Sequence, residues 1–124
     1  MHEILSVTLR CDCWAPMLAR NAVRASGAFD SVLEDAVLLA SELVSSLVDD
    51  RRCSPLSELE LVAEPTDRGI RIIATSADPE TALPTSQERC LPGLDERLAI
   101  VQALATDWGI ERDSRLCFWA ELAV

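Results

Sequence analysis

Apolar residues between positions 32 and 48 recur at every third or fourth position, a spacing that places them on one side of an α-helix. The central series consists of Val32, Ala36, Leu39, Leu43 and Leu47. A second apolar row lies beside it, so the stripe is wide enough to pack on a β-sheet. We therefore predict one amphipathic helix over residues 35–50, with Asp30 or Ser31 as its N-cap.

Two further helices are expected, one on each side of this segment. The first begins at the Ala-Pro pair of positions 15–16, because proline is tolerated in a first turn, and it ends at Gly27. Its expected apolar face comprises Met17, Leu18, Ala22 and Val23, extended by Ala25. Arg20 and Arg24, four positions apart, are expected to point outward. The helical period returns from Leu94 to near Asp107.

Alternating apolar and polar residues predict five strands. They are expected at residues 4–9, 59–64, 70–75, 108–110 and 116–122. The connector at residues 65–69 contains Pro, Asp and Gly, so the second and third strands should form an antiparallel hairpin. Residues 77–93 contain three prolines and no clear period, and we predict a long, lid-like loop there.

This order of elements predicts an α+β fold, because the helices are segregated from an antiparallel meander. We expect a two-layer sandwich, in which a mostly antiparallel sheet of about four to five strands is covered on one face by three helices. A length of 124 residues and an apolar content of 49% fit a single domain over residues 1–124.

The charge balance narrows the function classes. The chain has 21 acidic and 11 basic residues and a net charge of −10, which argues against binding to nucleic-acid phosphates. All the basic residues are arginines, so a phosphate-binding lysine is excluded. No apolar window is long enough to span a membrane, and the N-terminus lacks a signal-peptide pattern. We therefore expect a cytoplasmic protein.

Five cysteines, an odd number, are scattered along the chain at positions 11, 13, 53, 90 and 117. Their spacing fits neither a dense disulfide scaffold nor a zinc site. We predict free thiols in a reducing compartment. Redox sensing through Cys11 and Cys13 is an alternative that rests on their spacing alone.

Glu42 and Ser46 are the most informative polar pair, because they stand one turn apart on the predicted central helix. A carboxylate followed by a hydroxyl at this spacing can line a metal–phosphate pocket. The exposed face of any helix can also have this composition. The residues alone leave both interpretations open.

The element order, the Ala-Pro start and the arginine-rich first helix together carry a family resemblance. Segments 35–48, 98–110 and 118–122 strengthen it. The chain resembles the histidine-kinase-like ATPases (GHKL), and more narrowly the anti-sigma-factor serine/threonine kinases of actinobacterial type. The resemblance covers nearly the whole chain, and it implies the fold of these ATPases together with a site for MgATP.

The resemblance assigns roles to the central helix. In the family, a Glu acts as general base, and an Asn one turn later holds magnesium against the nucleotide phosphates. Glu42 matches the first position, whereas Ser46 replaces the Asn and becomes the candidate metal and cofactor ligand. Serine carries no carbonyl, which weakens magnesium coordination. Asp50 takes the place of a family His, where its charge would repel a polyphosphate.

Three more positions depart from the family pattern. Ser76 stands where an Asp accepts the adenine amino group, and Asp78 follows about 7 Å further along a strand. The Gly-x-Gly-Leu phosphate loop is replaced by residues 95–98, in which two acids precede Arg97. Cys117 replaces a polar Thr of the last strand. Ser76, Asp78 and Arg97 are thus the remaining candidate nucleotide contacts in an altered site.

Two functions of different classes follow. We favour a regulatory protein that has neither kinase activity nor a bound cofactor and that binds another protein through Arg20 and Arg24. Both arginines could also simply be solvated. The partner would be a sigma factor, an anti-anti-sigma-like protein, a DNA-binding regulator or a second copy, with no direct contact to nucleic acid or membrane. The alternative is an active serine/threonine kinase that uses MgATP, with Glu42 as base and Ser46 on magnesium.

Overall fold

The computed structural model describes residues 4–49, 56–76, 94–112 and 115–124, and the structural statements below concern those ranges. The elements are β1 (Leu5–Arg10), α1 (Ala15–Ser26), the 3₁₀ turn η1 (Asp30–Val32), α2 (Leu33–Val48), β2 (Glu58–Pro65), β3 (Gly69–Ser76), α3 (Leu94–Leu104), β4 (Asp107–Arg112) and β5 (Leu116–Ala123). The predicted order of helices and strands is confirmed.

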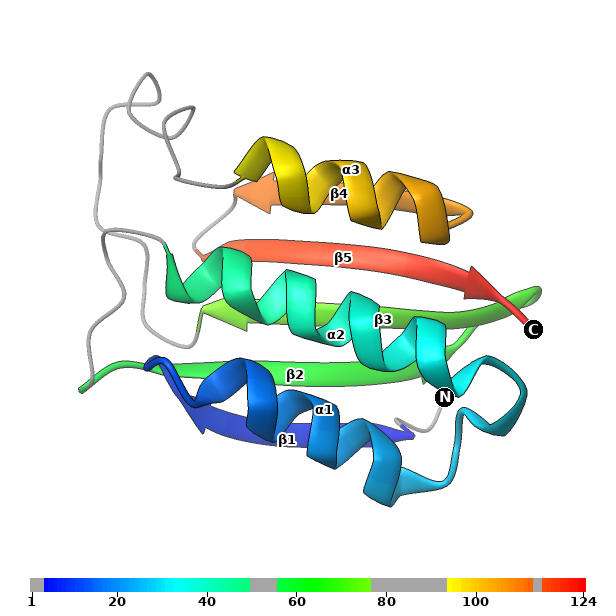
Figure 1. Ribbon diagram of the computed structural model, residues 1–124, viewed down its shortest axis with the longest axis horizontal. Coiled ribbons are helices and arrows are strands. Elements are labelled where there is room, and N and C mark those ends of the chain that lie inside the picture. Colours follow the sequence, from blue (N-terminus) through cyan, green and yellow to red (C-terminus); the bar gives the residue numbers. More distant parts are fainter. Residues whose placement is uncertain (1–3, 50–55, 77–93, 113–114) are drawn as a thin grey trace.

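All five strands form one antiparallel sheet in the order β1-β2-β3-β5-β4. The three helices lie together on one face of this sheet (Figure 1). Helix α1 packs against β1, α2 against β3 and β5, and α3 against β4. The predicted α+β two-layer sandwich and the β2–β3 hairpin are therefore confirmed.

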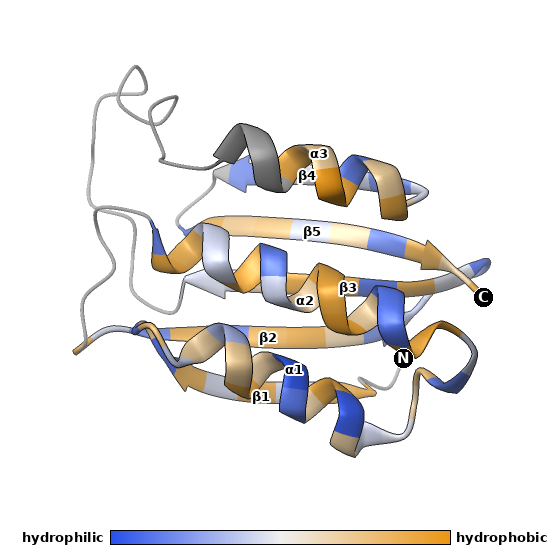
Figure 2. Cartoon of the chain, in the orientation of Figure 1, coloured by the Kyte–Doolittle hydropathy of each residue, from blue (hydrophilic) through white to orange (hydrophobic). Residues whose placement is uncertain are grey.

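The core lies between α2 and the central strands. Strand burial alternates, so that every second side chain of β2, β3 and β5 faces the helices. The largest fully buried side chains are Phe29, Phe118, Leu39, Leu59, Leu61, Ile72, Val23 and Val44. Figure 2 shows apolar residues along much of α2 and along β2. The apolar ladder of the central helix thus packs on the sheet as its spacing predicted.

The predicted apolar face of α1 is wrong in part. The buried side chains are Ala15, Ala19 and Val23, whereas Met17 and Leu18 face solvent. All three buried residues stand four positions apart and are small, which lets α1 approach β1 and α2 closely. Packing distance, rather than side-chain hydrophobicity, decides which face is buried here.

The start of α2 also differs from the prediction. Neither Asp30 nor Ser31 caps it; Val32 occupies the N-cap position, with no side-chain cap hydrogen bond. Its backbone N–H donates to the Phe29 carbonyl at 2.8 Å, closing the turn of η1. Because Phe29 is almost fully buried, it anchors this turn, and the chain enters α2 through η1 without a side-chain cap.

Helix α3 ends earlier and β4 extends further than the sequence predicted. The helix stops at Leu104 and β4 begins at Asp107, because pairing with β5 starts there. The N–H of Thr106 donates to the Glu121 carbonyl at 2.9 Å, directly before this pairing. Asp107, near which the helix was expected to end, is therefore the first residue of β4.

Candidate functional site on α2 and α1

The positions that the resemblance assigned to a nucleotide site gather at one end of the molecule. The C-terminal ends of α2 and β3 and the N-terminal end of α3 all lie at the left of Figure 1. Ser46 belongs to the last turns of α2, and Ser76 is the last residue of β3. Asp50 and Asp78, the loop predicted at 77–93, and the side chain of Arg97 lie outside the described part of the structure.

Ser46 does not lie on a solvated helix face. It is only 4% exposed, and its hydroxyl donates a 2.9 Å hydrogen bond to the Glu42 carbonyl oxygen one turn earlier. The Glu42 side chain is half-buried. The only proton of the Ser46 hydroxyl is therefore committed to the backbone of its own helix, a pattern common for serine inside helices.

We expect Ser46→Ala to leave the free energy of unfolding unchanged or to raise it by about 0.5 kcal/mol. Alanine has the higher helix propensity, and the Glu42 carbonyl keeps its backbone hydrogen bond within the helix. Urea denaturation of the variant and the wild type gives the comparison. A loss above about 1 kcal/mol would show that the hydroxyl makes a contact beyond its own helix.

Arg20 connects α1 to α2 instead of pointing outward. Its Nη1 atom donates a 2.8 Å hydrogen bond to the Ser41 hydroxyl oxygen on α2, and the arginine is half-buried. Ser41 itself is buried. Arg24 is exposed, as predicted. Local spacing does not predict the Arg20–Ser41 contact, because it depends on how the two helices cross.

Replacement of Arg20 by Met should lower the free energy of unfolding by about 1–2 kcal/mol, since a hydrogen bond from a charged donor to a buried hydroxyl is lost. Arg24→Met removes the same charge from an exposed position of the same helix. It should change the free energy of unfolding by less than about 0.5 kcal/mol. Equal losses in the two variants, measured by urea denaturation, would contradict a specific role for Arg20.

An exposed apolar surface on α1 was not foreseen. Trp14 is 61% exposed, Met17 38% and Leu18 42%, and all three lie within the start and first turn of this helix. Arg24 is exposed two turns further on. We call these four residues the α1 surface. Tryptophan and arginine are the residue types that contribute most to protein–protein binding energy.

Cys117 lies on the face of the sheet opposite the helices. It pairs with Thr75, while its neighbours Leu116 and Phe118 are buried on the helix side. The Thr75 hydroxyl donates to its sulfur at 3.7 Å. Burial raises the pKa of the Cys117 thiol. Cys117 therefore lies at the same end of the sheet as Ser76, but its side chain is on the face away from α2.

Among the described cysteines, the expectation of free thiols is wrong for Cys11. Cys11 is disulfide-bonded, whereas Cys13, which is exposed, and Cys117 are free thiols. Cys11 and Cys13 are therefore not joined to each other. The Cys11 sulfur also lies 3.9 Å from the Leu47 carbonyl oxygen of α2.

Among the described residues, no three His, Cys, Asp or Glu side chains are grouped closely enough to hold a metal ion. None of the described helices has the length and apolar character needed to cross a membrane. No family model and no curated protein sequence matches the chain.

Proposed function

We propose that this protein is a regulator that acts by binding another protein through its α1 surface. We further propose that it has the fold of the histidine-kinase-like ATPases of anti-sigma-factor type, with an altered nucleotide site and no kinase activity. The single observation that carries the proposal is the exposure of Trp14, Met17 and Leu18 together on one helix.

The α1 surface has the composition of a binding site. Large apolar side chains on a surface gain free energy when a partner removes them from water, at about 25 cal/mol per Å². Clusters of such side chains beside a polar rim are typical of protein interfaces. The exposed Arg24 supplies a positive group at the end of this surface in a chain whose net charge is −10. An acidic or mixed-charge partner surface would complement it.

Two features support a loss of nucleotide binding. Ser46, at the position where the resemblance implies a magnesium ligand, is only 4% exposed, so its oxygen is largely closed to a metal ion. The overall charge of −10, without any lysine, also disfavours a polyphosphate ligand. An active kinase that uses MgATP is the second candidate, because Glu42 is retained on α2 and is half-buried.

The partner class follows from the resemblance: a sigma factor, an anti-anti-sigma-like protein, a DNA-binding regulator or a second copy of this chain. Affinity capture with the tagged protein from source cells identifies the candidate. The captured protein is then purified and titrated against α1-surface variants by calorimetry.

The test compares two apolar residues of almost equal exposure, Met17 at 38% and Ile110 at 37%. Met17 lies on α1, whereas Ile110 lies on β4 at the far edge of the sheet. Met17→Ser and Trp14→Ser should each weaken binding about tenfold or more, a change of about 1.4 kcal/mol. Ile110→Ser should leave the affinity unchanged. Equal weakening by Met17→Ser and Ile110→Ser, or wild-type affinity of Trp14→Ser, would contradict the proposal.

A further inference from the structure

The face of the sheet opposite the helices is not covered by any helix or strand in the described part of the chain (Figure 1). Cross-strand pairing places its side chains in rows that cross the strands. The middle row consists of Ser6, Val62, Ile73, Trp119 and Gly109. The row on one side of it consists of Glu64, Arg71, Glu121 and Asp107. The row on the other side consists of Thr8, Glu60, Thr75, Cys117 and Glu111. We call this surface the open face.

The middle row is apolar. Val62, Ile73 and Trp119 are neighbours on β2, β3 and β5, and all three are half-buried. The Trp119 ring lies against Gly109 of β4 so closely that a Cβ atom there would stand 2.8 Å from the indole. On β3, the Arg71 guanidinium carbon lies 4.8 Å from the Trp119 ring centroid. Gly109 of β4 and Arg71 of β3 therefore fix the position of the indole from both sides of β5.

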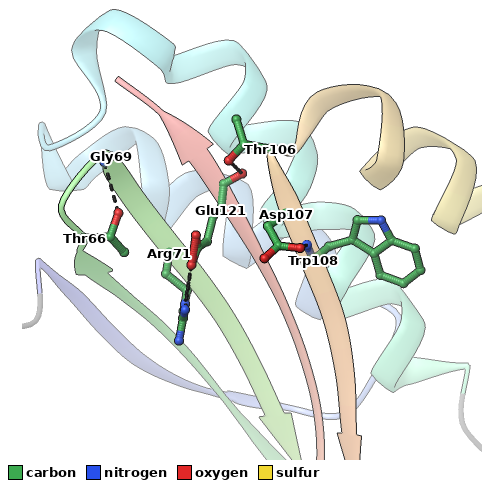
Figure 3. A network of polar contacts seen from close by, with 7 residues as sticks. All are labelled: Thr66, Gly69, Arg71, Thr106, Asp107, Trp108 and Glu121. Carbon is green, nitrogen blue, oxygen red and sulfur yellow. Dashed lines mark hydrogen bonds and ion pairs between the residues drawn. The ribbon is translucent and has the colours of Figure 1, made fainter.

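The rows on both sides are acidic. The two flanking rows contain five carboxylates: Glu60, Glu64, Asp107, Glu111 and Glu121. Arg71 is the one basic residue in these rows, so the open face carries a net charge of −4. Arg71 is paired with Glu121 through contacts of 2.6 and 3.1 Å, as Figure 3 shows with the helices behind the sheet. The remaining carboxylates stand about 7 Å from the apolar row, on both sides of it.

We infer that the open face binds a cationic surface of another protein, one in which an apolar strip is flanked by arginine or lysine side chains. The apolar row would receive the strip, and the acidic rows would receive the positive charges. The open face of a second copy of this chain also carries a charge of −4, so the two faces would repel each other. Nucleic acid and anionic lipid, which are also negatively charged, would be repelled in the same way. This inference depends neither on the α1 surface nor on the state of the nucleotide site.

The test uses a fluorescein-labelled amphipathic helical peptide of leucine and lysine, with a leucine–glutamate peptide of the same pattern as control. Anisotropy should show saturable binding of the lysine peptide alone, weakening as salt is added. Ile73→Ser and the double variant Glu60→Gln with Glu111→Gln should each weaken binding about tenfold. The double variant changes only side chains beside the apolar row, so it remains informative if Ile73→Ser does not fold. Trp14→Ser, on α1, should bind as the wild type does. Binding that is lost with Trp14→Ser but kept in the open-face variants would overturn the inference.

Two free thiols give an independent readout. Cys117 lies on the open face beside Trp119, whereas Cys13 is exposed near the start of α1. Bound lysine peptide should slow the reaction of Cys117 with N-ethylmaleimide at least threefold and leave the rate at Cys13 unchanged, as followed by peptide mass spectrometry. Protection of Cys13 without protection of Cys117 would place the peptide elsewhere and overturn the inference.

Discussion

Replacing Gly69 with alanine is expected to lower the free energy of unfolding by about 3 kcal/mol or more. A Cβ atom at this position would stand 1.8 Å from the Leu122 carbonyl oxygen and 2.8 Å from its carbonyl carbon. Both atoms belong to the backbone of β5, so no side-chain rotation relieves the overlap. Relief requires β3 and β5 to separate where Gly69 pairs with Ala123.

The turn before β3 would be affected as well. The Gly69 carbonyl accepts a 2.8 Å hydrogen bond from the Thr66 N–H. The Gly69 N–H in turn donates to the Thr66 hydroxyl at 3.0 Å (Figure 3). Gly27→Ala is the matched control: φ is 68° there, but nothing lies within 4 Å of the added Cβ. That change should cost only about 1 kcal/mol, from backbone conformation alone. Urea denaturation showing equal losses in the two variants would rule out the close approach as the cause.

The second large effect concerns two adjacent leucines of α2. Leu39 is fully buried on the sheet side, whereas Leu38 is 41% exposed. Leu39→Ala should lower the free energy of unfolding by about 2–5 kcal/mol, because it removes buried methyl groups and leaves a cavity. Leu38→Ala should change it by less than about 1 kcal/mol. Thermal and urea unfolding of the pair test which face of α2 forms the core; similar losses, or a larger loss for Leu38→Ala, would contradict the fold.

The contrast between α2 and α1 shows how far sequence patterns determine the fold. The ladder of Leu39, Leu43 and Leu47 has large side chains at helical spacing with a second apolar row beside it, so both the helix and its buried face were predictable. On α1, small residues at positions 15, 19 and 23 compete with the larger Met17 and Leu18. Hydrophobicity favours the larger side chains, but the short distance between packed elements selects the small ones.

Long-range contacts account for the other differences. The N-cap prediction for α2 failed because the buried Phe29 and a backbone hydrogen bond shape the turn before the helix. The Arg20–Ser41 hydrogen bond depends on how two helices cross. The position of Cys117 on the open face depends on strand register, where a shift of one residue would reverse it. None of these contacts follows from local spacing.

The candidate site was predictable in position more than in chemistry. The resemblance led us to Glu42, Ser46 and Ser76, and the ends of α2 and β3 that carry them lie at the same end of the molecule. The burial of Ser46 and its hydrogen bond to the Glu42 carbonyl could not be foreseen, because the sequence does not state how much of the helix the neighbouring elements cover. The α1 surface became visible only when the small residues of that helix proved to be the buried ones.

The most direct test of the proposed function is thermal unfolding followed at increasing MgATP, with calorimetric titration as a second measurement. A ligand present at a hundredfold its dissociation constant would stabilise the folded protein by roughly 2.7 kcal/mol, a shift of several degrees in the unfolding midpoint. We predict no shift and no binding heat at millimolar MgATP. A saturable rise of the midpoint, matched by a binding isotherm, would contradict the proposal and favour the active-kinase alternative.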